Sequence, residues 1–310
     1  MKTFILSHDR EGAISRAAAL IRAGGLVAFP TETVYGLGAN ALNAEAVARI
    51  FAAKGRPRTS PLIVHVDSIE MARGLAAEWP ASAETLAPRY WPGPLTLVVP
   101  KRDVIPGIVT AGLGTVGLRM PAHPLALELI RLAGVPIAAP SANRFTELSP
   151  TSAERVAETL ADFVLDGGPS QVGIESTVLS LASEPALLRP GVIPLTEIEA
   201  LIGPVRRAGE VSETSETAQP SPGMHRRHYR PKTPLYLLPV GHEPPAGHGI
   251  FLRIGREMPA EPRQYAAVLY ETLHRLDLEG LDWIGVEPPP DTPEWAGVRD
   301  RLERAATRAD

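Results

Sequence analysis

Short polar segments recur along the first two thirds of the chain, and each contains side chains suited to binding oxyanions. They are residues 30–38 (PTETVYGLG), 54–61 (KGRPRTSP), 140–143 (PSAN), 175–177 (EST) and 188–191 (LRPG). Hydroxyl groups and backbone N–H groups bind the oxygens of phosphates and carboxylates, while Lys and Arg neutralise their charge. The composition of these segments therefore indicates a site for phosphate and carboxylate groups.

Each polar residue also has a purely structural explanation. A single Ser or Thr at a strand end is more often a cap or turn residue than a ligand, and Lys54 could cap the C-terminus of a helix. It is the joint occurrence of these residues that favours a binding site. A formal G-x-G-x-x-G match at residues 112–117 is followed by LRMP, which cannot begin the long helix that a dinucleotide site needs, so we expect no dinucleotide there.

Apolar periodicity predicts the elements that position these segments. Helices are expected at 9–21, 44–53 and 123–133. A further helix is expected from Thr151-Ser152 through Leu160, and two more should begin after Ser68 and Ser82, which are predicted as their N-caps. Short apolar runs predict strands at 26–29, 62–66, 95–99, 116–118, 137–139, 163–165, 177–181 and 186–188. The alternation is typical of an α/β layer fold with a largely buried sheet, in which ligands bind at polar loops beyond the strand ends.

The last third of the chain changes character. Residues 204–223 carry Glu, Ser, Thr and Pro without an apolar face, which predicts a flexible linker, and residues 224–232 are basic and aromatic. Strands at 235–238, 249–253 and 283–286, with helices at 265–276 and 294–306, predict a small βαβ-type unit. We therefore expect a first domain over 1–203, a linker over 204–233 and a second domain over 234–310.

Composition excludes several classes of protein. The chain has 310 residues, a net charge of −4 and no cysteine, so disulfides, thiolate nucleophiles and cysteine-based zinc sites are excluded and no global positive field attracts nucleic acid. The start lacks an apolar signal-peptide core, and no stretch approaches the roughly 18 apolar residues of a membrane span. We expect a cytoplasmic protein without a membrane partner.

The polar segments together resemble one family. PTETVYGLGAN (30–40), KGRPRTSPLIVH (54–65), LRMPAHP (118–124), APSAN (139–143), ESTV (175–178) and LRPG (188–191) match the YrdC/Sua5 family in order and spacing over essentially all of 1–203. HYRPKTP (228–234) and the second domain resemble the long Sua5 type. The resemblance implies a twisted, open, mixed α/β sheet with a deep concave cavity, and a small Rossmann-like C-terminal domain whose linker crosses the active site.

The same resemblance implies an activity, that of a threonylcarbamoyl-AMP synthase. Such an enzyme is a nucleotidyltransferase that makes L-threonylcarbamoyladenylate and pyrophosphate from L-threonine, bicarbonate or CO2, and ATP, for the t6A modification of ANN-decoding tRNAs. Mg2+ is expected to arrive with ATP, held mainly by phosphates and water. A downstream tRNA threonylcarbamoyl transferase complex would accept the product, and weak RNA binding is also implied.

Family roles carry over to individual residues. The positions that resemble L-threonine ligands are Thr33, His65, Arg119 and Ser176. Those that resemble ATP ligands are Lys54, Arg56, Ser60, Thr115, Ser141, Asn143, Ser149, Arg189 and the linker residue Tyr229, and the K-x-R…S-x-N set of Lys54, Arg56, Ser141 and Asn143 is the catalytic signature. Residues 224–232 are interpreted as a lid. His65 could be a general base, because a histidine pKa can lie near 7, but we favour a binding role.

Three alternatives stay open from the sequence. An RNA-binding module would suit a concave basic face, although the net charge of −4 argues against strong nonspecific binding. A carbamoyl-transferring enzyme of the hydrogenase-maturation type would carry zinc fingers, which the absence of cysteine disfavours. An inactive paralogue is disfavoured by the intact signature residues.

Overall fold

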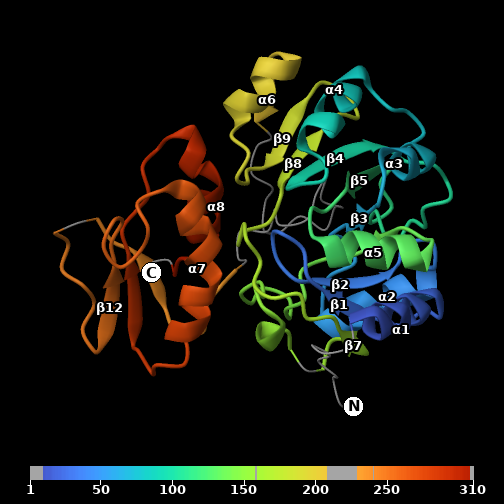
Figure 1. Ribbon diagram of the computed structural model, residues 1–310. Helices are drawn as coiled ribbons and strands as arrows, with labels where there is room; N and C mark the ends of the chain where they lie inside the picture. Colours follow the sequence, from blue (N-terminus) through green and yellow to red (C-terminus); the bar gives the residue numbers. More distant parts are fainter. Residues whose placement is uncertain (1–9, 158, 208–228, 240, 308–310) are drawn as a thin grey trace.

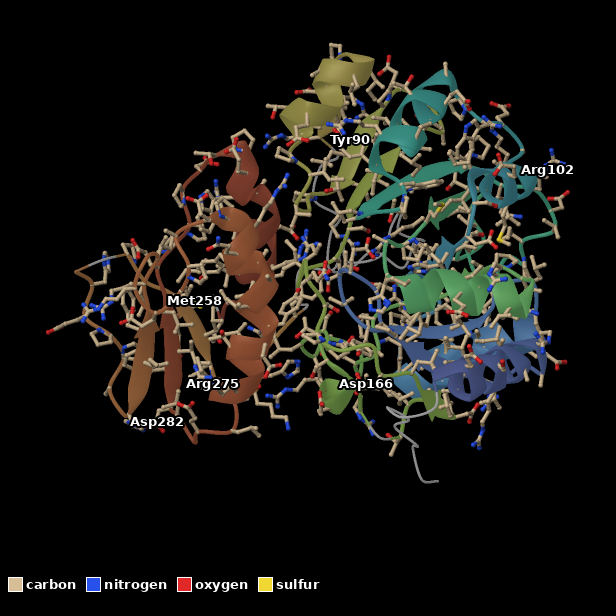
Figure 2. The ribbon with its side chains drawn as sticks, viewed as in Figure 1. Tyr90, Arg102, Asp166, Met258, Arg275 and Asp282 are labelled. Atoms are coloured by element: carbon tan, nitrogen blue, oxygen red, sulfur yellow. The ribbon has the colours of Figure 1, made fainter. Side chains whose placement is uncertain are left out.

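The chain folds into two α/β units, each built on its own sheet (Figure 1). The computed structural model describes residues 10–157, 159–207, 229–239 and 241–307. Tyr90, Arg102 and Asp166 belong to the larger unit, and Met258 and Arg275 to the smaller one (Figure 2). The polar segments identified in the sequence all lie in the larger unit.

The larger unit contains a ten-stranded mixed sheet in the order β10-β9-β8-β4-β5-β3-β6-β2-β1-β7. Four pairs of neighbouring strands are parallel (β1–β7, β3–β5, β4–β8 and β9–β10) and the other five are antiparallel, as expected for a mixed sheet. The strands are β1 Val27–Phe29, β2 Gly36–Asn40, β3 Ile63–His65, β4 Leu95–Pro100, β5 Thr115–Arg119, β6 Ile137–Ala138, β7 Phe163–Val164, β8 Thr177–Ser180, β9 Ala186–Arg189 and β10 Arg206–Arg207.

Helices cover both faces of this sheet, because successive strand residues point to opposite sides. In β1, Val27 and Phe29 pack in the cluster formed with α1 and α5, whereas Ala28 packs in the cluster on the other face. The first face holds α1 (Arg10–Arg22) and α5 (Pro124–Ala133). The second holds α2 (Ala44–Lys54), α3 (Ile69–Leu75), α4 (Ala81–Tyr90) and α6 (Leu195–Ile202).

Local capping explains where several helices begin and end. The Asn43 side chain accepts hydrogen bonds from the N–H groups of Glu45 and Ala46 at the start of α2, and Gly55 ends it in the left-handed conformation. The predicted N-cap Ser68 is confirmed, since its hydroxyl accepts from Met71 N at 3.1 Å. The predicted N-cap Ser82 is wrong, because α4 starts earlier, behind Pro80.

Two further predictions for the larger unit are wrong. Instead of a helix from Thr151 to Leu160, the described residues form only a short 3-10 turn, η1 (Ala153–Arg155), because the chain returns to an extended conformation at Val156. Part of the expected loop 30–38 is strand β2. The formal G-x-G-x-x-G segment leads into strand β5 and not into a helix, as expected.

The smaller unit confirms the predicted βαβ arrangement. Strands β11 (Leu235–Leu237), β13 (Trp283–Val286) and β12 (Gly249–Leu252) form a parallel sheet in that order, and α7 (Pro262–Leu276) connects β12 to β13. A 3-10 turn, η2 (Pro293–Trp295), leads into α8 (Ala296–Ala305). Helices α7 and α8 lie between this small sheet and the larger unit (Figure 1). The C-terminal helices therefore form the contact between the units.

Candidate active site

A polar cavity lies on the face of the large sheet where the side chains of Ile63 and His65 project. These two residues are separated by two positions in β3 and therefore share a face, and His65 is paired in register with Arg119 of β5. The cavity has a volume of about 540 Å³ when the solvent-filled space at its opening is included. Its lining includes Thr31, Thr33, Val34, Gly36, Arg56, Ile63, His65, Arg119, Ala139, Pro140, Ser141, Glu175, Arg189 and Tyr229.

One end of the cavity contains residues predicted to bind L-threonine. Arg119 is buried, its Nη2 lies 2.7 Å from Oε1 of Glu32, and its Nε donates to the Gly93 carbonyl at 3.3 Å. The hydroxyl oxygens of Thr33 and Thr31 are 2.9 Å apart. This end therefore combines one guanidinium with two hydroxyl groups, which is a suitable set for an amino acid carboxylate and its polar side chain.

His65 lies beside Arg119 and is buried. Burial, and then the charge of Arg119, lower the pKa of His65 to about 3. Within the described residues its Nδ1 atom is buried without a hydrogen-bond partner. The imidazole is therefore neutral in this environment, in keeping with the binding role favoured from the sequence. A neutral ring with an unpartnered nitrogen is better suited to binding a hydroxyl than to removing protons.

Lys54 organises the loop that follows β6. As the last residue of α2, it extends its ammonium group to the carbonyl oxygens of Ser141, at 2.6 Å, and of Asn143. The amide of Asn143 in turn donates to the carbonyl oxygens of Arg144 and Glu147. Burial, and then the charge of Arg56, hold the pKa of Lys54 well below its usual value. Lys54 thus joins the K-x-R and S-x-N segments, which are far apart in the sequence.

Arg56 and Arg189 provide two more buried cations. Arg56 donates to Oγ of Ser60 at 2.5 Å and to the Pro61 carbonyl at 3.0 Å, and burial lowers the pKa of its guanidinium to about 10. Arg189 donates from Nε to the Ser176 carbonyl at 3.2 Å, and burial lowers its pKa as well. Buried cations that depart from their usual pKa gain from a bound anion, so this end suits a phosphate chain.

The structure brings most of the predicted site residues together. Seven of them line the cavity: Thr33, Arg56, His65, Arg119, Ser141, Arg189 and Tyr229. Five more contact a lining residue or its loop: Lys54, Ser60, Asn143, Ser149 and Ser176. Thr115 is apart from them, because it lines an adjacent small hollow that shares Ile63 with the cavity.

Two carboxylates at the cavity were not assigned from the sequence. Glu32 pairs with Arg119, and Glu175 is hydrogen-bonded by Ser149 at 2.6 Å. Both residues stand within the quoted motifs, in PTET and EST. The sequence did contain a signal for these two residues, because each is an acidic residue inside a segment interpreted as anion-binding. A buried negative charge there requires a cation close by.

The linker residue Tyr229 reaches the cavity. Its side chain is buried, and its ring stacks on Tyr270 of α7 with the centroids 5.8 Å apart. Its backbone has φ 63, a left-handed conformation that a bulky residue adopts only when its surroundings fix it. Residues 224–228 of the predicted lid lie outside the described part of the chain.

The described part of the chain contains neither a cluster of metal-binding side chains nor a membrane-spanning helix. No group of three or more His, Asp or Glu side chains in this part of the chain could hold a metal ion. None of the described helices is long and apolar enough to cross a membrane.

The mixed sheet, its polar cavity and the small parallel-sheet unit define an α/β protein with the YrdC-like fold. The sequence model of the Sua5/YciO/YrdC family, described as telomere recombination, matches residues 19–191. The model of the threonylcarbamoyl-AMP synthase C-terminal domain matches residues 193–307. The chain therefore belongs to the Sua5/YrdC family of threonylcarbamoyl-AMP synthases, which are enzymes.

Individual relatives agree with this assignment. The threonylcarbamoyl-AMP synthase of Bacillus subtilis is 44% identical over 321 residues, which covers 94% of this chain and 92% of the relative. That of Pyrococcus abyssi is 53% identical over 232 residues, covering 74% and 68%. A crystal structure of P. abyssi Sua5 complexed with L-threonine superposes with a TM-score of 0.88 at 41% identity, covering 98% and 97%.

Proposed function

We propose that this chain makes L-threonylcarbamoyl-AMP and pyrophosphate from L-threonine, bicarbonate or CO2, and ATP. The observation that carries the proposal is a single cavity lined both by residues predicted for threonine and by residues predicted for ATP. A reaction between two substrates requires them to be held side by side, and this lining provides for both. The product would supply the t6A modification of ANN-decoding tRNAs through a separate transferase.

The threonine end would be defined by Arg119 and His65. A carboxylate accepts two parallel hydrogen bonds from a guanidinium, so Arg119 is the natural partner of the threonine carboxylate. The unpartnered Nδ1 of His65 is suited to the threonine hydroxyl, with Thr33 nearby. The amino group would then remain available for reaction.

The nucleotide end would be defined by Arg56, Arg189 and the loop that Lys54 holds. These buried cations would neutralise the charge that develops on phosphate oxygens as pyrophosphate leaves. Mg2+ bound to the phosphates would share this neutralisation. The carboxylate of Glu175, which lines the cavity, is already hydrogen-bonded by Ser149, so we expect phosphates and water to supply most of the metal ligands.

The chemistry has two steps and needs no covalent enzyme intermediate. The threonine nitrogen adds to the carbon of CO2 and loses a proton, which gives a carbamate. A carbamate oxygen then attacks the α-phosphorus of ATP, and the bond from this phosphorus to the bridging oxygen breaks to release pyrophosphate. Both intermediate and product are labile in water, so buried Tyr229 at the cavity is consistent with a linker that excludes solvent.

The test is an adenylate-forming assay. The purified protein is incubated with ATP labelled at the α-phosphate, Mg2+, bicarbonate and L-threonine, and each component is omitted in turn. A labelled adduct that requires both threonine and bicarbonate, with an equal amount of pyrophosphate, is expected. ADP formation, or an adduct that does not depend on threonine, would refute the proposal and redirect attention to RNA binding.

A further inference from the structure

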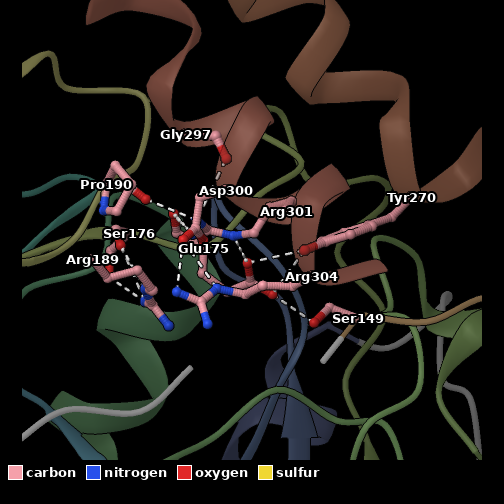
Figure 3. A network of polar contacts seen from close by, with 10 residues as sticks. All are labelled: Ser149, Glu175, Ser176, Arg189, Pro190, Tyr270, Gly297, Asp300, Arg301 and Arg304. Atoms are coloured by element: carbon pink, nitrogen blue, oxygen red, sulfur yellow. Dashed lines mark hydrogen bonds and ion pairs between the residues drawn. The ribbon is translucent and has the colours of Figure 1, made fainter. Parts of the chain in front are cut away.

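Glu175 is a buried carboxylate that belongs to the cavity but is held from outside the larger unit (Figure 3). Oε2 of Glu175 accepts from Nε of Arg301 at 2.8 Å and from the Tyr270 hydroxyl at 3.1 Å. Its Oε1 atom accepts from the Ser149 hydroxyl at 2.6 Å. Arg301 is on α8 and Tyr270 on α7, so two of the three donors come from the C-terminal unit.

Arg301 is the centre of these contacts. Its side chain is fully buried, with 0% exposure, although arginine is rarely excluded from water. Besides Glu175, its guanidinium donates to the Pro190 carbonyl at 2.8 Å and to Asp300 at 2.8 Å. It also lies over the ring of Tyr229, 5.3 Å from the centroid. Every one of these partners belongs to the cavity wall, to a loop beside it, or to α8.

The backbone contacts make this arrangement specific. A methyl group added to Gly173, two residues before Glu175, would lie 2.3 Å from the Ala266 carbonyl oxygen of α7. One added to Gly297 of α8 would lie 2.6 Å from the Gly191 carbonyl oxygen. Val34, Leu148 and Ile174 of the larger unit also pack into the apolar core of the C-terminal unit. Helices α7 and α8 are therefore in close backbone contact with the loop that carries Glu175 and with the loop that follows Arg189 at the end of β9.

An unpaired carboxylate would be harmful at this position. Glu175 shares the cavity with Arg189, and phosphate groups bound there would be repelled by an adjacent negative charge. Arg301, which is not among the residues that line the cavity, neutralises that charge through its ion pair with Glu175. The Ser149 and Tyr270 hydroxyl groups complete the carboxylate's hydrogen bonds, as a buried charge requires.

We propose that Arg301, assisted by Tyr270, is a positioning residue for nucleotide binding: it fixes Glu175 and the ring of Tyr229 and cancels the charge of Glu175 beside the phosphate-binding cations. The inference rests on the proposed function and deepens it, because it assigns a task to the C-terminal unit. Neither residue touches the cavity directly, so each acts through Glu175 and Tyr229. The C-terminal unit is accordingly a part of the nucleotide site.

The experiment measures steady-state KM for ATP and for L-threonine in full-length variants. Arg301→Met is expected to raise KM for ATP by roughly tenfold or more, as for a lost hydrogen bond to a charged group, with a smaller change in KM for threonine. Tyr270→Phe keeps the ring on Tyr229 but removes one donor, so a shift in the same direction, about threefold, is expected. Adding Glu175→Gln to Arg301→Met removes the uncompensated charge and is expected to recover most of the ATP affinity.

Arg155→Ala is the matched control, because Arg155 forms an ion pair with Glu271 of α7 between the same two units, at 2.6 Å, without contacting Glu175. Unchanged KM values for ATP in both Arg301→Met and Tyr270→Phe would overturn the proposal, as would equal effects of Arg301→Met and Arg155→Ala. If Arg301→Met does not fold, Tyr270→Phe and Arg301→Lys decide the matter. An inactive wild-type protein would instead refute the proposed function, so the two failures are distinguishable.

Discussion

Arg119 and Glu32 face each other in the part of the cavity proposed to bind threonine, with Nη2 of the arginine 2.7 Å from Oε1 of the glutamate. Both atoms are buried, yet within the described residues neither makes a hydrogen bond of good geometry. The contact is therefore a charge pair and not a hydrogen bond. A substrate carboxylate at Arg119 would compete with Glu32 for the same guanidinium.

This competition predicts the behaviour of Glu32→Gln. The variant leaves the buried Arg119 charge without its partner, which is expected to lower the stability of the free protein by about 3 kcal/mol. The carboxylate of L-threonine would replace that partner, so threonine should raise the melting temperature more in the variant than in the wild type. Thermal unfolding with and without threonine measures this difference. Glu84→Gln, which breaks an exposed ion pair with Arg73, is the control and should change little. Equal threonine shifts in wild type and Glu32→Gln would argue against Arg119 as the carboxylate ligand.

Lys54 offers a second prediction. Its buried ammonium group donates to two carbonyl oxygens of the 141–143 loop, so Lys54→Met should distort that loop and remove a cation from the part of the site proposed to bind the nucleotide. Adenylate formation is expected to fall by about a hundredfold or more. Lys54→Arg should not restore it, because a planar guanidinium cannot fit between two carbonyl groups placed for a compact ammonium. Lys101→Met removes a lysine outside the cavity and should retain the wild-type rate. A near-normal rate in Lys54→Arg would show that only the charge matters.

The apolar runs of the sequence predicted most of the sheet and its helices, but two kinds of feature were missed. Strand β2 is written GLGAN, without the β-branched residues that usually signal a strand. The structure explains why: a methyl group on Gly38 would lie 2.7 Å from the Phe29 ring. The bulk of the neighbouring side chains therefore leaves room only for a small residue in this strand. Such a constraint exists only in the folded sheet.

Pairing across the chain was also beyond the sequence. The segments predicted to bind oxyanions were evident from their composition, and the structure brings most of them to one cavity. The counter-charges were not evident, because Glu32 meets Arg119, and Glu175 meets Arg301, only after distant segments have packed. The role of the C-terminal helices therefore depends on tertiary contacts that no local pattern contains.

His65 makes a prediction about pH. Its pKa in the folded protein is about 3, below its ordinary value of 6.5, so between these values the unfolded chain binds the extra proton. Stability should therefore fall as pH decreases through 6.5 toward 3. From about pH 8 to about pH 5, the neutral His65 should lower the free energy of unfolding by about 2 kcal/mol. This loss should be absent in His65→Asn. Denaturant unfolding at several pH values measures the difference, with His242→Asn as a surface control. Parallel pH profiles for wild type and His65→Asn would show that the imidazole is not held neutral.

The contact between Gly173 and helix α7 gives the last prediction. Gly173 has φ 76, and a methyl group there would meet the Ala266 carbonyl oxygen at 2.3 Å, so Gly173→Ala imposes both backbone strain and a clash with α7. Gly112 has a similar φ, 81, with nothing within 4 Å, so Gly112→Ala imposes only the backbone strain. We expect Gly112→Ala to cost about 1–2 kcal/mol and Gly173→Ala to cost several kcal/mol. Because α7 carries Tyr270, only Gly173→Ala should also raise KM for ATP. Equal losses of stability in the two variants, with unchanged KM, would mean that α7 can move away from the active-site loop without consequence.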